Sequence, residues 1–229
     1  MSIPDHDALG YGARAGAGQA GDRAGRGHRC VAGRTMRDVR LLIVPGLHDS
    51  GPAHWQSWLQ GQFRDSLRVR QRDFGDPHLD RWAARIAAVL DQAGEAQRWI
   101  AVAHSFGCLA LARHLALAPE SPIAAALLVA PAEPEKFGVT SLLPHRPLGV
   151  PSTLVASDSD PWMHADSTRR WAARWGSHWL TLGDAGHINA ESGFGPLPLA
   201  KRWVTATRQR LARVNRPHLA RPPEWSFAM

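Results

Sequence analysis

Short runs of apolar residues alternate along this chain with segments in which apolar residues recur every three or four positions. The run from Val39 to Val44 is continuous, as expected for a β-strand that is covered on both faces. Further strands are predicted at residues 67–71, 98–103, 124–130, 153–156 and 178–182. Helical patterns are found at residues 53–63, from 80 onward, at 108–116, 165–175 and 197–214.

The helical segment near residue 80 illustrates the pattern. Trp82, Ile86, Val89 and Leu90 fall on one face of a helix. Asp80 precedes them, and aspartate is a favoured N-cap because its carboxylate accepts hydrogen bonds from the first free N–H groups. We therefore expect Asp80 to cap this helix.

The alternation of strands and helices predicts the fold class. It indicates an α/β protein with a mostly parallel sheet and helices on both faces. In such sheets, functional sites form at the carboxyl ends of the strands, where the loops converge. The chemistry is therefore expected on the loops after Val44, Ala103, Ala156 and Leu182.

Composition divides the 229 residues into three parts. Residues 1–35 contain many glycines, alanines and arginines and almost no large apolar side chains, so we predict a disordered extension. Residues 36–214 are long enough for one domain with a sizeable core. Residues 215–229 hold three prolines and few core residues, and we predict a loose C-terminal tail.

The sequence Ala-His-Ser-Phe-Gly at 103–107 follows a predicted strand and precedes a predicted helix. This is the setting of a nucleophile elbow, a cramped turn that presents a serine. Such a turn requires small residues two positions before and two after the serine. Ala103 and Gly107 meet that requirement, so Ser105 is the candidate nucleophile.

Two later loops supply the partners that a serine nucleophile needs. Asp160 follows the strand that ends at Ala156, and His187 follows the strand that ends at Leu182. The order serine, aspartate, histidine is that of the α/β-hydrolase triad. Histidine would accept the serine proton, and the carboxylate would orient the imidazole. Asp158 is an alternative acid, and we favour Asp160 because it precedes a proline where the loop should bend.

Backbone N–H groups are expected to stabilise the oxyanion. One would come from Phe106, the residue after the nucleophile, and the other from Leu47, on the loop after the first strand. Gly46 would let this loop approach the site. The assignment rests on position in the sequence.

Several side chains are candidates for the lining of a pocket. His48 and His54 follow the first strand and stand as either pocket-lining or surface residues, and Trp162 follows the candidate acid. The Pro-rich loop 132–149, with Phe137, Leu142 and Leu143, is expected to form a small apolar rim. His104 is expected to be structural.

The formal net charge of +7 raises the question of a nucleic-acid partner. The arginines are scattered among acidic residues and are not interleaved with aromatic residues, so we expect no nucleic-acid partner. No apolar run approaches the length that spans a bilayer, and no secretory signal is recognised. Two cysteines, Cys30 and Cys108, indicate a reducing compartment, and we expect a cytoplasmic protein.

The quoted motifs together resemble a known family. Residues 43–56, 103–108, 157–161 and 186–189 are similar to the small single-domain serine hydrolases related to retinoblastoma-binding protein nine. The resemblance spans about residues 39–212. It implies an α/β-hydrolase core without a large cap domain, with Ser105, Asp160 and His187 as the triad.

The expected activity is hydrolysis of a carboxylic ester or amide through an acyl-enzyme. Small carboxylic esters are favoured because no large cap is expected to enclose a bulky substrate. No metal or cofactor is expected, since no ligand spacing is convincing. Two alternatives stay open: a weakly active or inactive hydrolase fold that binds a protein partner, and acyl transfer to an acceptor other than water.

Overall fold

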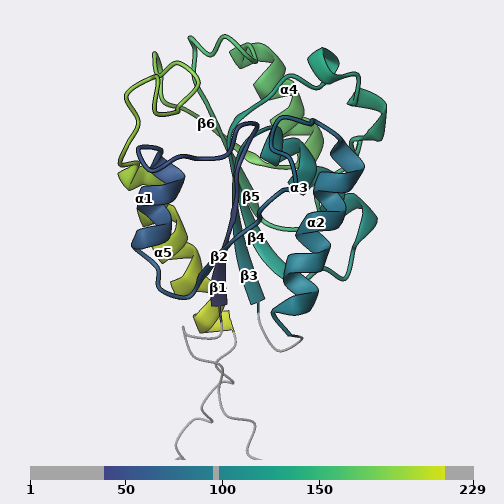
Figure 1. The fold of residues 1–229 in the computed structure, drawn as a ribbon, viewed down its shortest axis with the longest axis vertical. Coiled ribbons are helices and arrows are strands. Elements are labelled where there is room, and N and C mark those ends of the chain that lie inside the picture. Colours follow the sequence, from purple (N-terminus) through teal and green to yellow (C-terminus); the bar gives the residue numbers. More distant parts are fainter. Residues whose placement is uncertain (1–38, 95–97, 215–229) are drawn as a thin grey trace, which may run out of the picture. The chain divides into compact units, whose positions relative to one another are not determined.

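A computed structural model describes residues 39–94 and 98–214. Within these residues, six strands form one sheet in the order β2-β1-β3-β4-β5-β6, and every neighbouring pair is parallel (Figure 1). The strands are β1 (Val39–Val44), β2 (Ser66–Arg68), β3 (Arg98–Ser105), β4 (Ile123–Pro131), β5 (Ser152–Ala156) and β6 (His178–Thr181). The predicted extension, 1–35, and the predicted tail, 215–229, lie outside the described residues.

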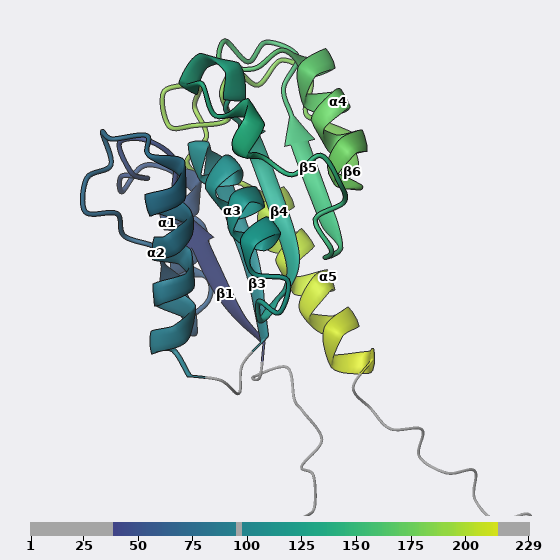
Figure 2. The ribbon, with the colours of Figure 1, turned by 90° about the vertical axis from the view of Figure 1, so that its right-hand side faces the viewer.

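Helices cover both faces of the sheet, as Figures 1 and 2 show. They are α1 (Trp55–Gly61), α2 (Leu79–Gln92), α3 (Phe106–Leu117), α4 (Ala165–Trp175) and α5 (Pro198–Val214). Helices α1 and α5 lie on one face, and α2, α3 and α4 lie on the other. This arrangement confirms the predicted α/β class with a mostly parallel sheet.

The sequence pattern explains why each face is covered. Alternate residues of a strand point to opposite faces of the sheet. Leu42 and Val44 of β1 accordingly join the core on the side of α2 and α3, whereas Leu41 and Ile43 join the core on the side of α1 and α5. All four are fully buried, so β1 has to be apolar throughout.

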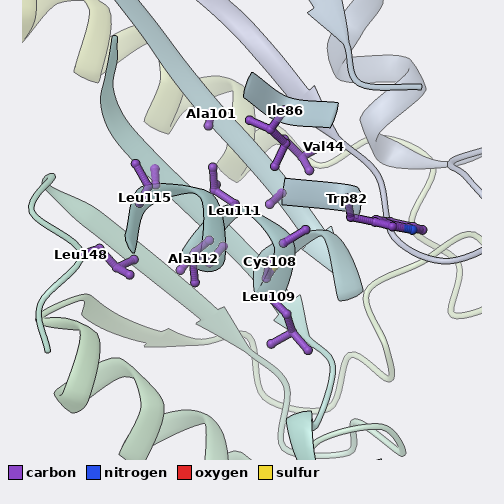
Figure 3. Close-up of a cluster of buried hydrophobic side chains, with 14 of the residues drawn as sticks. Val44, Trp82, Ile86, Ala101, Cys108, Leu109, Leu111, Ala112, Leu115 and Leu148 are labelled. Carbon is purple, nitrogen blue, oxygen red and sulfur yellow. The ribbon is translucent and has the colours of Figure 1, made fainter. Parts of the chain in front are cut away.

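Helix α3 lies against the centre of the sheet and is buried along most of its length. Figure 3 shows Cys108, Leu111 and Ala112 of this helix within the core cluster that also contains Trp82 and Ile86 of α2. Burial raises the pKa of the Cys108 thiol, and its Sγ donates to the carbonyl oxygen of Val129. Cys108 is therefore a packing residue.

The prediction that Asp80 caps α2 is wrong. Helix α2 begins at Leu79, and its N-cap is His78, whose Nδ1 accepts a hydrogen bond from the N–H of Arg81. Asp80 lies in the first turn instead, where a negative charge is favourable near the positive end of the helix dipole. Its carboxylate binds Arg113 of α3 at 2.8 Å.

The segment between β4 and β5, predicted as a loop, contains two short 3₁₀ helices, η2 (Pro134–Phe137) and η3 (Thr140–Leu142). No large cap domain is inserted within the described residues. Across 39–94 and 98–214, none of the helices combines the length and apolar character required to cross a bilayer.

Candidate active site

The nucleophile elbow joins β3 directly to α3. Ser105 ends the strand with φ of 53° and ψ of −128°, and α3 begins at the next residue. A non-glycine residue with positive φ is strained, and such strain concentrates at functional sites. The strained turn lifts the Ser105 side chain to the carboxyl edge of the sheet, where it is half-buried.

Two glycines allow the loop after β1 to approach this elbow. A Cβ atom at Gly107 would lie 2.3 Å from the carbonyl oxygen of Pro45, and one at Gly46 would lie 2.7 Å from Cβ of Ser105. Neither distance is compatible with a side chain. The loop and the elbow therefore contact each other through both glycines.

The structure brings Ser105, His187 and Asp160 together in one hydrogen-bonded chain. Nε2 of His187 lies 2.9 Å from Oγ of Ser105, and its Nδ1 lies 2.9 and 3.0 Å from the two carboxylate oxygens of Asp160. Because a carboxylate accepts, the proton of the neutral ring resides on Nδ1. Nε2 is therefore free to accept the proton of Ser105.

The two candidate acids have different partners. Asp160 is buried, and its Oδ1 also accepts a hydrogen bond of 2.8 Å from the N–H of Trp162. Asp158 accepts a hydrogen bond from Oγ1 of Thr181 at 2.9 Å instead. Asp160 is therefore the acid that binds the imidazole of His187, and it is also the residue favoured over Asp158 from the sequence.

Replacing each acid separately tests this difference. Asp160→Asn should lower kcat for an activated ester such as 4-nitrophenyl acetate by about 10³- to 10⁴-fold, because an amide favours the wrong tautomer of His187. The matched change Asp158→Asn should alter kcat by less than about threefold. A larger loss for Asp158→Asn than for Asp160→Asn would contradict the assignment.

His104, beside the nucleophile, has a structural role. It is buried, and its Nε2 donates a 3.0 Å hydrogen bond to the backbone carbonyl of His187. Burial lowers the pKa of His104 well below its ordinary value, and the neighbouring His187 and His54 lower it further. The ring is therefore neutral, and it fixes the backbone that carries His187.

Helix α1 is tied to strands β1 and β3 and to the loop that follows His187. The side-chain Nε2 of buried Gln56 donates to the carbonyl oxygens of Val44 and Val102, at 3.2 and 3.1 Å. The indole N–H of Trp55 donates to the carbonyl oxygen of Ile188 at 2.8 Å. One turn of α1 thus holds the end of β1 and the loop that follows His187.

Gln56 was not identified as a site-supporting residue from the sequence. Its Oε1 also accepts a 2.6 Å hydrogen bond from Oγ of Ser50, so every polar atom of this fully buried amide is engaged. The only signal for it in the sequence is its place at the end of the motif at 43–56. A polar residue that is buried in a helix must be satisfied by long-range partners, which periodicity does not reveal.

The two expected oxyanion donors lie beside Ser105. Leu47 lines the same cavity as Ser105, and its N–H forms no backbone hydrogen bond in the described part of the chain. Phe106 is the first residue of α3, a position at which an N–H has no acceptor within the helix. Both positions are therefore suited to the expected role.

Ser105 opens into a cavity of about 450 Å³. All three of the expected lining residues, His48, His54 and Trp162, belong to its wall. Phe137 also belongs to it and packs against Phe106, with ring centroids 5.0 Å apart. The expectation for the rest of the rim is wrong, because Leu142 and Leu143 pack against the core on the α2 and α3 side.

The wall of the cavity combines apolar and polar side chains. Leu47, Phe137 and Trp162 are among the apolar ones, and Trp162 is 47% exposed with its ring 6.1 Å from that of His187. His48 and His54 are among the polar ones. Among residues 39–94 and 98–214, no group of three or more His, Cys, Asp or Glu side chains could hold a metal ion.

Strained backbone gathers around the site. The described non-glycine residues with positive φ are His48, Asp49, Ser105, Ala130 and Ile188. All of them lie at or after the carboxyl ends of strands or next to His187. Asp49 helps to hold its loop, since Oδ1 accepts from the N–H of Ser50 and from Arg68.

The chain matches a protein family and is similar to solved structures. A family model described as serine hydrolase matches residues 41–206. A crystal structure of a YdeN-like hydrolase from Pectobacterium atrosepticum is 38% identical in sequence, with a TM-score of 0.66, and the match covers 77% of this chain and 90% of that one. No protein with a curated description matches the chain in a sequence search.

Two more distant structures share the fold. The ydeN gene product of B. subtilis is 19% identical, with a TM-score of 0.61, over 73% of this chain and 97% of that one. Est1E of Butyrivibrio proteoclasticus, solved with ferulic acid bound, is 15% identical, with a TM-score of 0.57, over 80% of this chain and 92% of that one. At these identities the likeness concerns the fold alone.

Proposed function

The chain belongs to the serine hydrolase family, and we propose that it hydrolyses carboxylic esters through an acyl-enzyme formed on Ser105. The observation that carries the proposal is the hydrogen-bonded chain from Ser105 through His187 to Asp160 beside an open cavity. A serine, an imidazole and a carboxylate in this arrangement form the machinery of acyl transfer.

The first half of the reaction forms the acyl-enzyme. Oγ of Ser105 attacks the ester carbonyl carbon while Nε2 of His187 takes the serine proton. The N–H groups of Leu47 and Phe106 stabilise the negative charge on the carbonyl oxygen of the tetrahedral intermediate. His187 then donates its proton to the departing alcohol oxygen, and the acyl group stays on Ser105.

The second half releases the acid. Water attacks the acyl carbon, and Nε2 of His187 accepts its proton. When the tetrahedral intermediate collapses, the same proton returns to Oγ of Ser105. Throughout the cycle, Asp160 keeps the Nδ1–H of His187 in place and stabilises the imidazolium.

Small esters are the substrates that this site favours. The absence of a large cap within the described residues leaves the cavity open, and about 450 Å³ is at the small end of ligand pockets. Esters also need less leaving-group activation than amides.

Labelling and turnover of the full-length protein test the proposal. A fluorophosphonate probe should add once, and peptide mapping should place the adduct on Ser105. A series of 4-nitrophenyl esters from acetate to dodecanoate should show turnover that is greatest for the short acyl chains. Labelling at another residue, or no turnover of any ester by protein that is labelled at Ser105, would contradict ester hydrolysis.

The second outcome would favour the alternative of a binding protein that retains the triad. A product other than the free acid, seen when an alcohol or amine acceptor is added, would favour acyl transfer. The cytoplasmic location and the lack of a nucleic-acid partner stay predictions.

A further inference from the structure

His54 is held by its Nδ1 atom at the N-terminus of α1. This nitrogen accepts a 3.1 Å hydrogen bond from the backbone N–H of Gln56, so it serves as the N-cap acceptor of the helix. A backbone N–H can only donate, which requires a lone pair on Nδ1. In a neutral imidazole the single proton must then be on Nε2.

The ring of His54 is neutral at physiological pH. The pKa of His54 is lowered to about 4, mainly by burial and also by Arg68 and His187, while Asp49 opposes this shift. The residue is 6% exposed, and its ring packs edge-on against His104 with centroids 4.8 Å apart. His54 is therefore a rigid hydrogen-bond donor that does not titrate near neutral pH.

The Nε2–H of His54 is unused within the described part of the chain. The hydrogen bonds of that part involve Nδ1 alone. Among residues 39–94 and 98–214, the fully buried side-chain nitrogens that lack a partner are those of Trp99, Trp179 and Arg208; Nε2 of His54 is not one of them, so it is not closed off from solvent. Since His54 lines the cavity that contains Ser105, this N–H opens into that cavity.

A fixed donor in such a place selects among ligands. A site that offers a hydrogen bond to one group discriminates strongly against analogues that lack the group, because the donor is then left unpaired. A charged ring could serve as a general acid, but a ring with this pKa and tautomer cannot do so at neutral pH. Its remaining role is recognition.

We propose that His54 is a specificity-determining residue, whose Nε2–H binds an acceptor oxygen of the substrate other than the reacting carbonyl oxygen. The inference rests on the proposed ester hydrolysis at Ser105. It defines the substrate class as esters that carry an ether, hydroxyl or carbonyl oxygen near the ester group. Purely hydrocarbon esters leave this donor without a partner.

Two substitutions distinguish the role of Nδ1 as the N-cap acceptor from the role of Nε2–H as the donor to the substrate. In His54→Asn, the amide oxygen takes the place of Nδ1 and keeps the N-cap, because asparagine is a strong N-cap residue, but no donor reaches the position of Nε2. In His54→Gln, the amide nitrogen reaches that position while the cap is lost. His78→Asn is the control, since Nδ1 of His78 also accepts a backbone N–H in the first turn of its helix, that of Arg81 in α2, and His78 is exposed.

Two pairs of esters that differ by one oxygen give the readout. On the acyl side, 4-nitrophenyl methoxyacetate is compared with 4-nitrophenyl butyrate, and on the alcohol side 2-methoxyethyl acetate is compared with butyl acetate. The ratio of kcat/KM within each pair is measured for the wild type and each variant. Intrinsic differences in reactivity cancel when the ratios are compared between proteins.

The expected result is a five- to tenfold fall of the ratio in at least one pair for His54→Asn, about the effect of one hydrogen bond. His54→Gln should keep the wild-type ratio with a lower denaturant midpoint, and His78→Asn should change neither ratio. Unchanged ratios in folded His54→Asn would overturn the proposal, as would a lost preference in His54→Gln. A wild type that hydrolyses no ester overturns the proposed function as well, so the two failures are distinguishable.

Discussion

Ser105→Ala should lower kcat/KM for ester hydrolysis by about 10⁵-fold. The substitution removes the only atom of the triad that bonds to the substrate, and loss of the nucleophile in serine hydrolases costs nearly as much as loss of the whole triad. The oxyanion donors and the cavity would survive, so a small residual rate above that of water is expected.

The fold should survive this change. The hydroxyl of Ser105 makes one hydrogen bond, to His187, and the side chain is half-buried. The free energy of unfolding, measured by denaturant titration, should therefore lie within about 1 kcal/mol of the wild-type value. Fluorophosphonate labelling should disappear at the same time.

Ser121→Ala is a suitable control for this variant. Ser121 lies between α3 and β4 at the other end of the sheet, where its Oγ is 2.9 Å from Nε2 of His114. It should retain both turnover and labelling. Full labelling of Ser105→Ala would show that another residue is the nucleophile.

Gly107→Ala should have the largest effect on stability. The added Cβ would lie 2.3, 2.7 and 2.9 Å from backbone atoms of Val44 and Pro45, at the end of β1. Backbone at the centre of a parallel sheet cannot move as the tip of a flexible side chain can. We expect a loss of at least about 3 kcal/mol in the free energy of unfolding, measured by urea denaturation.

Gly61→Ala is the matched control. A Cβ at Gly61, the exposed last residue of α1, meets no atom within 4 Å. Alanine is also the better helix former, so stability should stay the same or rise by up to about 1 kcal/mol. If Gly107→Ala unfolded at the same urea concentration as the wild type, the loop and the elbow would not pack as closely as described.

Local pattern was sufficient to predict the fold and the meeting of three distant residues. Val39–Val44 and Ala165–Trp175 have the predicted bounds. Once the strands are parallel, their carboxyl ends share one edge, so loops that carry Ser105, Asp160 and His187 have to converge there. The order of the strands and loops along the chain was enough to identify the three loops, and no interatomic distance was needed.

Features that depend on a specific three-dimensional contact were less accessible. Asp80 has the chemistry of an N-cap, but His78 takes that place because the helix begins two residues earlier than predicted. Leu142 and Leu143 are apolar enough for either a pocket rim or a core, and the packing of η3 decided for the core. The partners of Gln56 lie on two different strands, which no local pattern relates.

The way in which Asp160 is held has a consequence for how the substrate range of such an enzyme can diverge. It is the backbone N–H of Trp162, not its indole, that binds the carboxylate. The exposed ring of Trp162 can therefore be replaced by another side chain while the carboxylate of Asp160 keeps its position. Trp55 and Gln56, by contrast, hold the loop after His187 and the strands β1 and β3 through their side chains, so a mutation there is expected to disturb the site. Changes in substrate preference are accordingly expected to arise first at position 162.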